Sequence, residues 1–241
     1  MNAYPRRCSD AQAGATLFTT LIILLLVLML GIAAAQIALQ GEKAARNDRD
    51  RLIALQAAEA ALLDAELDIR HAADPGASRS HIFSADSKLG FPEAGGDACG
   101  SGMQNIYLGL CRSIADGSTP TWQNIDFSDT AAGTVHTVPY GRFTGQVFAV
   151  GAGALPAQLP RYAIELMDDK SISAVTGKPV YFYRVTAIGF GAHEATQVVL
   201  QTVYRKSLPP AASNLQPAQY AGRLSWREMI NWAELSRVDK E

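Results

Sequence analysis

LFTTLIILLLVLML, residues 17–30, lies at the centre of a stretch without a charged residue, which runs from residue 11 to residue 41. The apolar window 15–39 is long enough to cross a bilayer as a helix, which takes about 20 residues. A buried helix of a soluble protein rarely lacks polar positions over so many turns. The sequence therefore predicts a membrane-spanning helix over residues 15–41.

The helical pattern continues beyond this apolar segment. Between Gly41 and Pro75 there is no glycine or proline, and alanine is abundant. Apolar side chains repeat at helical spacing along one stripe, formed by Leu52, Leu55, Ala58, Leu62, Ala65 and Ile69. The run Asp74-Pro75-Gly76 then ends the helix. Residues 42–74 are therefore predicted as the amphipathic half of the same helix, and their apolar stripe needs a partner surface.

A cleaved secretory signal peptide is the main alternative for the apolar segment. Residues 31–35, GIAAA, imitate the small-residue site at which such a peptide is cut. The apolar run is too long for a signal peptide, however, and helical periodicity continues past it. A count of positive charges alone would place the C-terminal side in the cytoplasm. That count is set aside, because the basic residues after the segment are mixed with Glu42, Asp48 and Asp50.

The rest of the chain predicts a β-rich head, residues 75–208. Residues 75–145 are punctuated by Gly, Ser, Asp and Pro, which indicates loops. Strands are predicted at 146–150, 161–167, 180–188 and 196–204, with a hairpin at 189–195. Two strand faces are apolar, one with Tyr181, Tyr183, Val185 and Ala187, the other with Val198, Leu200 and Tyr204. We expect an antiparallel sheet packed on the amphipathic half of the helix, which gives an α+β fold.

Residues 209–241 form a C-terminal tail that starts with Pro209-Pro210, a stop for the last strand. Ser225 and Glu228 have the spacing of a capping box, which predicts that a short helix begins there. Met229, Ile230 and Ala233 would give this helix a packing face. Trp226 and Trp232 are read as packing or interface anchors.

The sequence carries no signature of catalysis. It has no P-loop, GxSxG or HExxH pattern, and its four histidines are scattered. His193-Glu194 is read as a solvated pair in the predicted hairpin, and Asp126 and Asp129 as a solvated turn rather than a calcium loop. The net charge of −2 provides no basic surface for nucleic acid. We therefore expect a non-enzymatic protein without a nucleic-acid partner. The sequence assigns no cofactor or metal ligand, and metal binding by the loops stays open.

The N-terminus resembles the type IV prepilin class, in which a short basic leader ending in glycine precedes a long apolar helix and a globular head. Arg6, Arg7 and the Gly14-Ala15 junction match that pattern. Residues 56–66, QAAEAALLDAE, and residues 222–228, GRLSWRE, look like minor pilins of the PilX family in particular. The resemblance covers the first seventy-odd residues well and the last hundred loosely.

This resemblance implies a sequence of processing, membrane anchoring and assembly. Residues 1–14 would be a cytoplasmic leader that a prepilin peptidase removes between Gly14 and Ala15, after which Ala15 is N-methylated. Residues 15–41 would hold the chain in the inner membrane with the head in the periplasm, and would later pack against other minor pilins and the major pilin. The expected destination is the tip of an extracellular pilus, where the partner is an adhesin of the PilY family.

Thr19 departs from the family pattern. Most pilins of this class have Glu at the fifth position of the mature chain, where it neutralises the N-terminal amine of the subunit ahead of it. An unpaired amine in the apolar core of a filament costs several kcal/mol. Thr19 offers only a hydroxyl, which is tolerable in a subunit with nothing ahead of it. The alternative is that this hydroxyl simply bonds the backbone of its own helix.

Cys8 would leave with the leader, so that Cys99 and Cys111 remain as an even pair. In an oxidising compartment we expect them to form a disulfide, and the alternative is two unrelated free thiols. No CxxC or paired-histidine spacing accompanies the pair, which argues against zinc.

Three other functions stay open. The nearest is a tip pseudopilin of a type II secretion system. A membrane-anchored exported binding protein that never polymerises is a second, and an exported enzyme is a third. N-terminal sequencing of the mature protein separates cleavage after Gly14 from an ordinary signal peptide.

Overall fold

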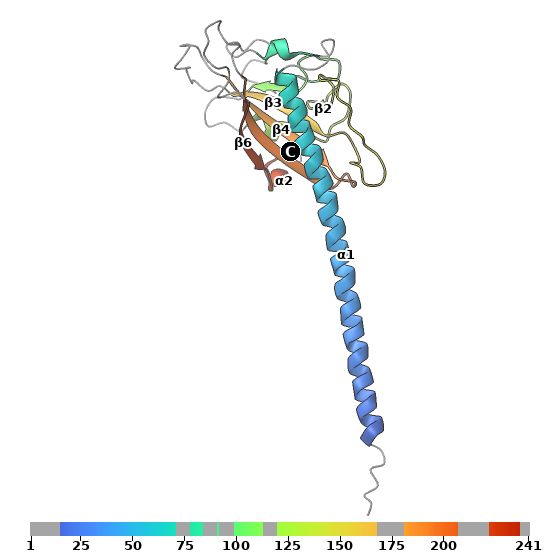
Figure 1. Cartoon of the computed structure of the whole chain (residues 1–241). Helices are drawn as coiled ribbons and strands as arrows, with labels where there is room; N and C mark the ends of the chain where they lie inside the picture. Colours follow the sequence, from blue (N-terminus) through green and yellow to red (C-terminus); the bar gives the residue numbers. More distant parts are fainter. Residues whose placement is uncertain are drawn as a thin grey trace, which may run out of the picture. The chain divides into compact units, whose positions relative to one another are not determined.

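The computed structural model describes residues 15–70, 78–83, 91, 99–112, 120–167, 181–206 and 222–236. Two compact units are present, Met1–Asp48 and Arg49–Glu241. The helices are α1 (Ala15–Arg70), the 3-10 turns η1 (Ser80–Ile82) and η2 (Thr121–Asn124), and α2 (Trp232–Leu235). The strands are β1 (Leu110–Arg112), β2 (Val138–Pro139), β3 (Arg161–Met167), β4 (Phe182–Phe190), β5 (Gln197–Arg205) and β6 (Gly222–Glu228) (Figure 1).

The predicted long helix is confirmed as α1. In the first unit, its apolar side chains from Leu17 to Leu39 are exposed on every side of the helix. Among the described residues, α1 is the one helix that is long and apolar enough to cross a membrane. The predicted helix stop at Asp74-Pro75-Gly76 lies outside the described residues.

In the second unit, the C-terminal half of α1 lies against the sheet, near β3 and β4 (Figure 1). Most of the buried apolar side chains on this half are small, namely Ala54, Ala57, Ala58, Ala61 and Ala65. The contact is closest at Gly189 in β4, where an added Cβ would clash with the backbone of Ala54 and Ala58. Alanine on the helix and glycine on the strand therefore let the two backbones approach directly.

The sheet is mixed rather than purely antiparallel. Its strand order is β1-β3-β4-β5-β6, with β2 also paired to β3. The pairs β3–β4, β4–β5 and β5–β6 are antiparallel as expected. The pair β1–β3 is parallel, which corrects the prediction of an antiparallel sheet. A three-residue strand such as β1 carries too short a pattern to be found from sequence.

Three of the four predicted strands exist, as β3, β4 and β5, and the hairpin joins the last two. The predicted apolar faces of β4 and β5 are confirmed, because Tyr183, Val185 and Ala187 pack in one core with Val198, Leu200 and Tyr204. The predicted strand at 146–150 is wrong, and these residues form an exposed loop. Gly145 and Gly151, both with positive φ, turn the chain at either end of that run.

The predicted capping box is also wrong, because residues 222–228 form strand β6 at the edge of the described sheet. The Ser225 hydroxyl oxygen accepts a hydrogen bond from the Val203 amide of β5 instead of capping a helix. The short helix of the tail begins later, at Trp232. Pairing with β5 therefore overrides the local helical signal.

A second core lies on the other face of the sheet and was not predicted. Trp232 of α2 packs there with its ring centroid 5.2 Å from that of Phe127 and 6.0 Å from that of Trp122. This confirms the role of Trp232 as a packing residue. Trp226, by contrast, stays 46% exposed on β6.

Candidate functional site

The first candidate site is the apolar N-terminal part of α1. Gly14 lies outside the described residues, and Ala15 is the first residue of the helix. The Thr19 hydroxyl donates to the carbonyl oxygens of Ala15, at 3.1 Å, and Thr16, at 3.0 Å. Its one O–H proton is thus shared within its own helix, as the alternative to tip placement expects. A surface that is apolar on all sides can be buried only in lipid or among other apolar helices.

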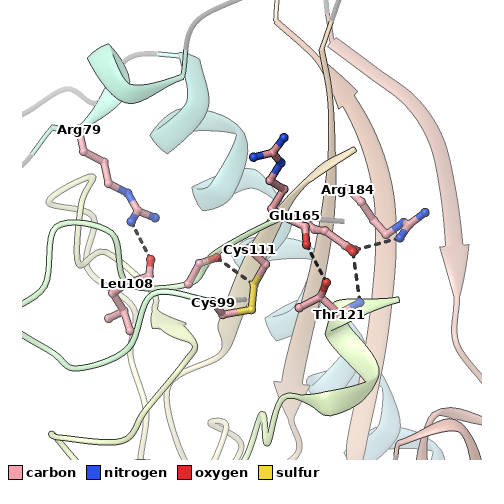
Figure 2. Close-up of a disulfide and its surroundings, with 9 residues drawn as sticks. Arg79, Cys99, Leu108, Cys111, Thr121, Glu165 and Arg184 are labelled. Atoms are coloured by element: carbon pink, nitrogen blue, oxygen red, sulfur yellow. Dashed lines mark hydrogen bonds and ion pairs between the residues drawn. A yellow bond between two sulfur atoms is a disulfide. The ribbon is translucent and has the colours of Figure 1, made fainter. Parts of the chain in front are cut away.

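The second candidate site is a fully buried charged centre in the head. The Arg79 guanidinium and the Asp68 carboxylate of α1 are both buried, with Arg79 Nη2 2.7 Å from Asp68 Oδ2. Arg79 Nη1 also donates to the carbonyl oxygens of Ile106 and Leu108, at 2.8 and 2.6 Å. Figure 2 shows Arg79 reaching toward Leu108 in the strand-like segment that precedes Cys111. Arg79 thus connects α1, through Asp68, to the segment between Cys99 and Cys111, through Ile106 and Leu108.

Tyr162 of β3 completes this centre by donating its hydroxyl proton to Asp68 Oδ2 at 3.0 Å. Burial, and then the negative charge of Asp68, raise the pKa of the Tyr162 hydroxyl well above its ordinary value. The tyrosine therefore remains a protonated donor. The Arg79 guanidinium and the Asp68 carboxylate are both hydrogen-bonded, which is what a buried ion pair requires, and we assign the centre a structural role.

Two further aspartates of α1 hold loops of the head. Asp64 accepts hydrogen bonds from the Gly141 amide, at 2.8 Å, and from the Thr144 hydroxyl. Burial raises the pKa of the Asp64 carboxyl, and these two hydrogen bonds act in the opposite direction. Asp50 accepts hydrogen bonds from the amides of Ala192 and His193, which follow β4. Asp64 and Asp50 thus connect α1 to the loops at residues 141–144 and 192–193 by hydrogen bonds.

The two motifs that carry the family resemblance meet in space. Arg223 of β6 donates through Nε to Glu66 at 2.7 Å and lies 3.4 Å from Glu59 through Nη1. Both glutamates belong to residues 56–66 of α1. Arg51 and Glu228 form a further ion pair between the same two elements. The edge strand is therefore attached to α1 by charge. Strands β3 and β4 pack on α1 through apolar side chains, and β3 adds the Tyr162–Asp68 hydrogen bond.

A disulfide joins Cys99 to Cys111, with Cα atoms 4.1 Å apart and twelve residues of sequence separation. Figure 2 shows it beside β3, whose Glu165 bonds Arg184 of β4 and the Thr121 amide of η2. Gly100 also exchanges backbone hydrogen bonds with the other arm, because its amide donates to Leu110 and its oxygen accepts from Gly109. The disulfide therefore closes a loop that the backbone already brings together.

We expect mature protein purified without reductant to weigh two mass units less than its reduced form. Replacing both Cys99 and Cys111 by serine should lower the free energy of unfolding by about 3 kcal/mol, since the unfolded chain loses a loop constraint of this length. Denaturant unfolding of oxidised and double-serine proteins measures the difference. Free thiols that react with an alkylating agent in the exported protein would contradict the prediction.

The remaining polar residues singled out by sequence form ordinary turns. Asp126 accepts hydrogen bonds from the amide and hydroxyl of Ser128, and Asp129 from the Ala131 amide and the Thr134 hydroxyl. His193 and Glu194 lie exposed in the β4–β5 turn. Within the described ranges, no group of three or more His, Cys, Asp or Glu side chains could hold a metal ion.

Comparison with known families gives two matches. The family model described as "PilX N-terminal" matches residues 13–63, and that described as "Type IV pilus assembly protein PilX C-term" matches residues 107–206. Together they cover more than half of the chain, including Gly14 and Ala15, most of α1 and strands β1 to β5. No curated protein and no solved structure matches the chain significantly.

Proposed function

Because the chain belongs to the PilX family of type IV pilus assembly proteins, we propose that it is a minor pilin of the filament tip, where it primes assembly with other minor pilins. The observation that carries this proposal is the match to the PilX N-terminal model over residues 13–63, which includes a helix apolar on all sides. A helix of this kind suits both a membrane and a bundle of similarly apolar helices. The role is structural, and the family is one of pilus assembly rather than catalysis.

The proposed route begins in the inner membrane. Residues 15–41 span the bilayer, with the leader 1–14 on the cytoplasmic side and the head in the periplasm. A prepilin peptidase cuts between Gly14 and Ala15, and Ala15 becomes N-methylated. The helix then leaves the lipid and packs among the helices of other minor pilins and of the major pilin. A PilY-family adhesin is the proposed partner of the head at the tip.

Thr19 supports the position ahead of all other subunits. Its hydroxyl bonds Ala15 and Thr16 of its own helix, as an ordinary threonine of a membrane helix also does, so the support comes only from the missing carboxylate. Thr19 carries no charge. It therefore cannot neutralise the amine of a preceding subunit. In the first subunit a glutamate at this position would be unpaired in an apolar environment, at a cost of about 2.5–3.5 kcal/mol for an acidic side chain at the centre of a membrane helix.

We expect close to one copy of the protein per filament, located at one end. Immunogold labelling of sheared filaments, with the major pilin as a shaft control, gives the count. Label at many positions along the shaft would show that Thr19 does not mark the tip.

A second arm of the test uses substitutions. Thr19→Glu should leave the number of pili per cell unchanged or lower it, because the new carboxylate has no amine to neutralise. Thr20→Glu is the matched control, since the Thr20 hydroxyl also bonds its own helix, donating to Leu17 O at 2.9 Å. A rise in pilus number, or new shaft labelling, with Thr19→Glu alone would contradict tip placement.

A further inference from the structure

One loop of the head exposes an uncharged, largely apolar surface. No charged residue or histidine occurs from residue 143 to residue 160. Within this stretch, residues 145–155, which we term the apolar loop, are exposed except for the half-buried Phe148. Val147 is 92% exposed, and Val150 and Leu155 are 38% and 40% exposed. A soluble head that displays such a surface usually has something to cover it.

The start of the apolar loop is held firmly by the head. The Gly145 amide donates to the Gly141 carbonyl oxygen at 2.9 Å, and the Gly141 amide donates to Asp64. The ring of Phe148 packs against that of Tyr140, with centroids 5.0 Å apart. These contacts fix the start of the loop in a conformation that leaves Val147 exposed.

The far part of the loop lies at the Asp50 end of the head. The Gly151 amide donates to Pro156 O at 2.9 Å, which closes a turn, and the Ala157 amide donates to Gly191 O at 2.8 Å. The next two residues, Ala192 and His193, donate their amides to Asp50. The turn of the apolar loop is therefore fixed close to the first residues of α1 that belong to the head unit.

Chain length keeps this end of the head near the membrane. Only eight residues, 42–49, separate Asp50 from the uncharged stretch that ends at Gly41. Eight residues of helix rise about 12 Å. The polar layer of a bilayer adds about 5–7 Å beyond the hydrocarbon on each side. With Gly41 at the boundary of the hydrocarbon, Asp50 is tethered about 12 Å beyond it, which is close to the lipid head groups.

We propose that the apolar loop is a second membrane contact, which lies in the interfacial layer of the bilayer while the subunit awaits assembly. This inference rests on the proposed membrane anchoring by residues 15–41 and is independent of tip placement. The exposed side chains of Val147, Val150 and Leu155 lose contact with water by entering the interface, and the loop backbone can remain hydrated there. A loop with a charged residue could not make this contact at so little cost. The contact would limit how far the head tilts about its tether.

Fluorescence in vesicles tests the contact with the full chain. A Cys8→Ser background keeps the disulfide and removes the remaining thiol. Val150→Cys then carries a polarity-sensitive nitrobenzoxadiazole label, and Ile106→Cys serves as the matched control. Ile106 is exposed to a similar degree, 42%, but its carbonyl contacts Arg79 at the Asp68 end of the head. The proteins are reconstituted in phosphatidylethanolamine–phosphatidylglycerol vesicles, with flotation to confirm insertion.

We expect nitroxide lipids labelled at the head group to quench the Val150 label and not the Ile106 label. Iodide present on both sides of the vesicles should quench the Val150 label at least about twofold less than the Ile106 label, because the interface shields it. Adding Val147→Asp should remove this protection, whereas Val147→Ala should retain most of it. The Val147 side chain is almost fully exposed, so neither change disturbs the fold.

Two outcomes would overturn the inference alone: a floating protein with both labels equally open to iodide, or one with both labels equally shielded. The first would leave the loop in water, and the second would show a contact that is not specific to it. Failure of the chain to float would overturn the proposed anchoring as well.

Discussion

Replacing Gly14 by arginine should abolish entry of the protein into filaments. The bulky charged side chain cannot occupy a peptidase site that is selective for glycine, so the leader stays attached. A retained leader carries Arg6 and Arg7 as well as the new charge, and these cannot enter the apolar core of a filament. Intact mass of the membrane fraction should show all fourteen leader residues, and sheared filaments should contain none of the variant.

The matched control is Ala11→Arg, which adds the same charge to the leader three residues before the junction. It should be cleaved and incorporated like the unchanged chain. An N-terminus found after Ala35 in the unchanged protein would instead establish an ordinary signal peptide. That result would remove the helix from the mature protein and end the filament interpretation.

Replacing Asp68 by alanine should destabilise the head by about 3–5 kcal/mol, because the buried Arg79 charge would then lack a counter-ion. The Tyr162 hydroxyl would lose its acceptor in the same step. Urea unfolding of the full chain in detergent measures the loss. Tryptophan fluorescence reports on the head specifically, since Trp122, Trp226 and Trp232 all belong to it.

Glu59→Ala is the matched control, because it removes a carboxylate of the same helix from a partly exposed ion pair with Arg223. Its expected cost is about 0–1 kcal/mol. The double variant Asp68→Ala/Arg79→Met should lose less stability than the sum of the two single variants, since each change removes the charge that the other leaves unpaired. Equal effects of Asp68→Ala and Glu59→Ala would show that the buried centre is hydrated and not a tight ion pair.

The parts of the fold that could be predicted from sequence are those whose signal is local. The apolar run 17–30 and the stripe through Ala58 and Ala65 repeat within a few residues, and both lie in α1 as expected. Strands β3, β4 and β5 have strong β-rich runs bounded by turn residues. Leader cleavage, methylation of Ala15 and the tip partners concern events outside the folded chain and remain predictions.

The features that could not be predicted depend on residues distant in sequence. Asp68 meets Arg79 eleven residues later and Tyr162 ninety-four residues later. Nothing in the residues around Asp68 distinguishes it from Asp48, although Asp68 is buried in the head and Asp48 is exposed. The one sequence feature that points to a buried Asp68 is its position in line with Ala61 and Ala65 on the same side of the helix. Strand β6 was misassigned because its pairing with β5, about twenty-five residues earlier in the chain, overrides a weak capping signal.

The backbone contact of Gly189 with Ala54 and Ala58 has a mechanical consequence. A tensile load along α1 is transferred to β4 at a point without flexible side chains, so the helix cannot slide past the strand by rotamer changes. The carboxylates of Asp50 and Asp64 lie on the same helix on either side of that point in sequence and tie it to separate loops. Such a load therefore acts on the Asp50, Gly189 and Asp64 contacts at the same time, in shear, instead of breaking them one after another.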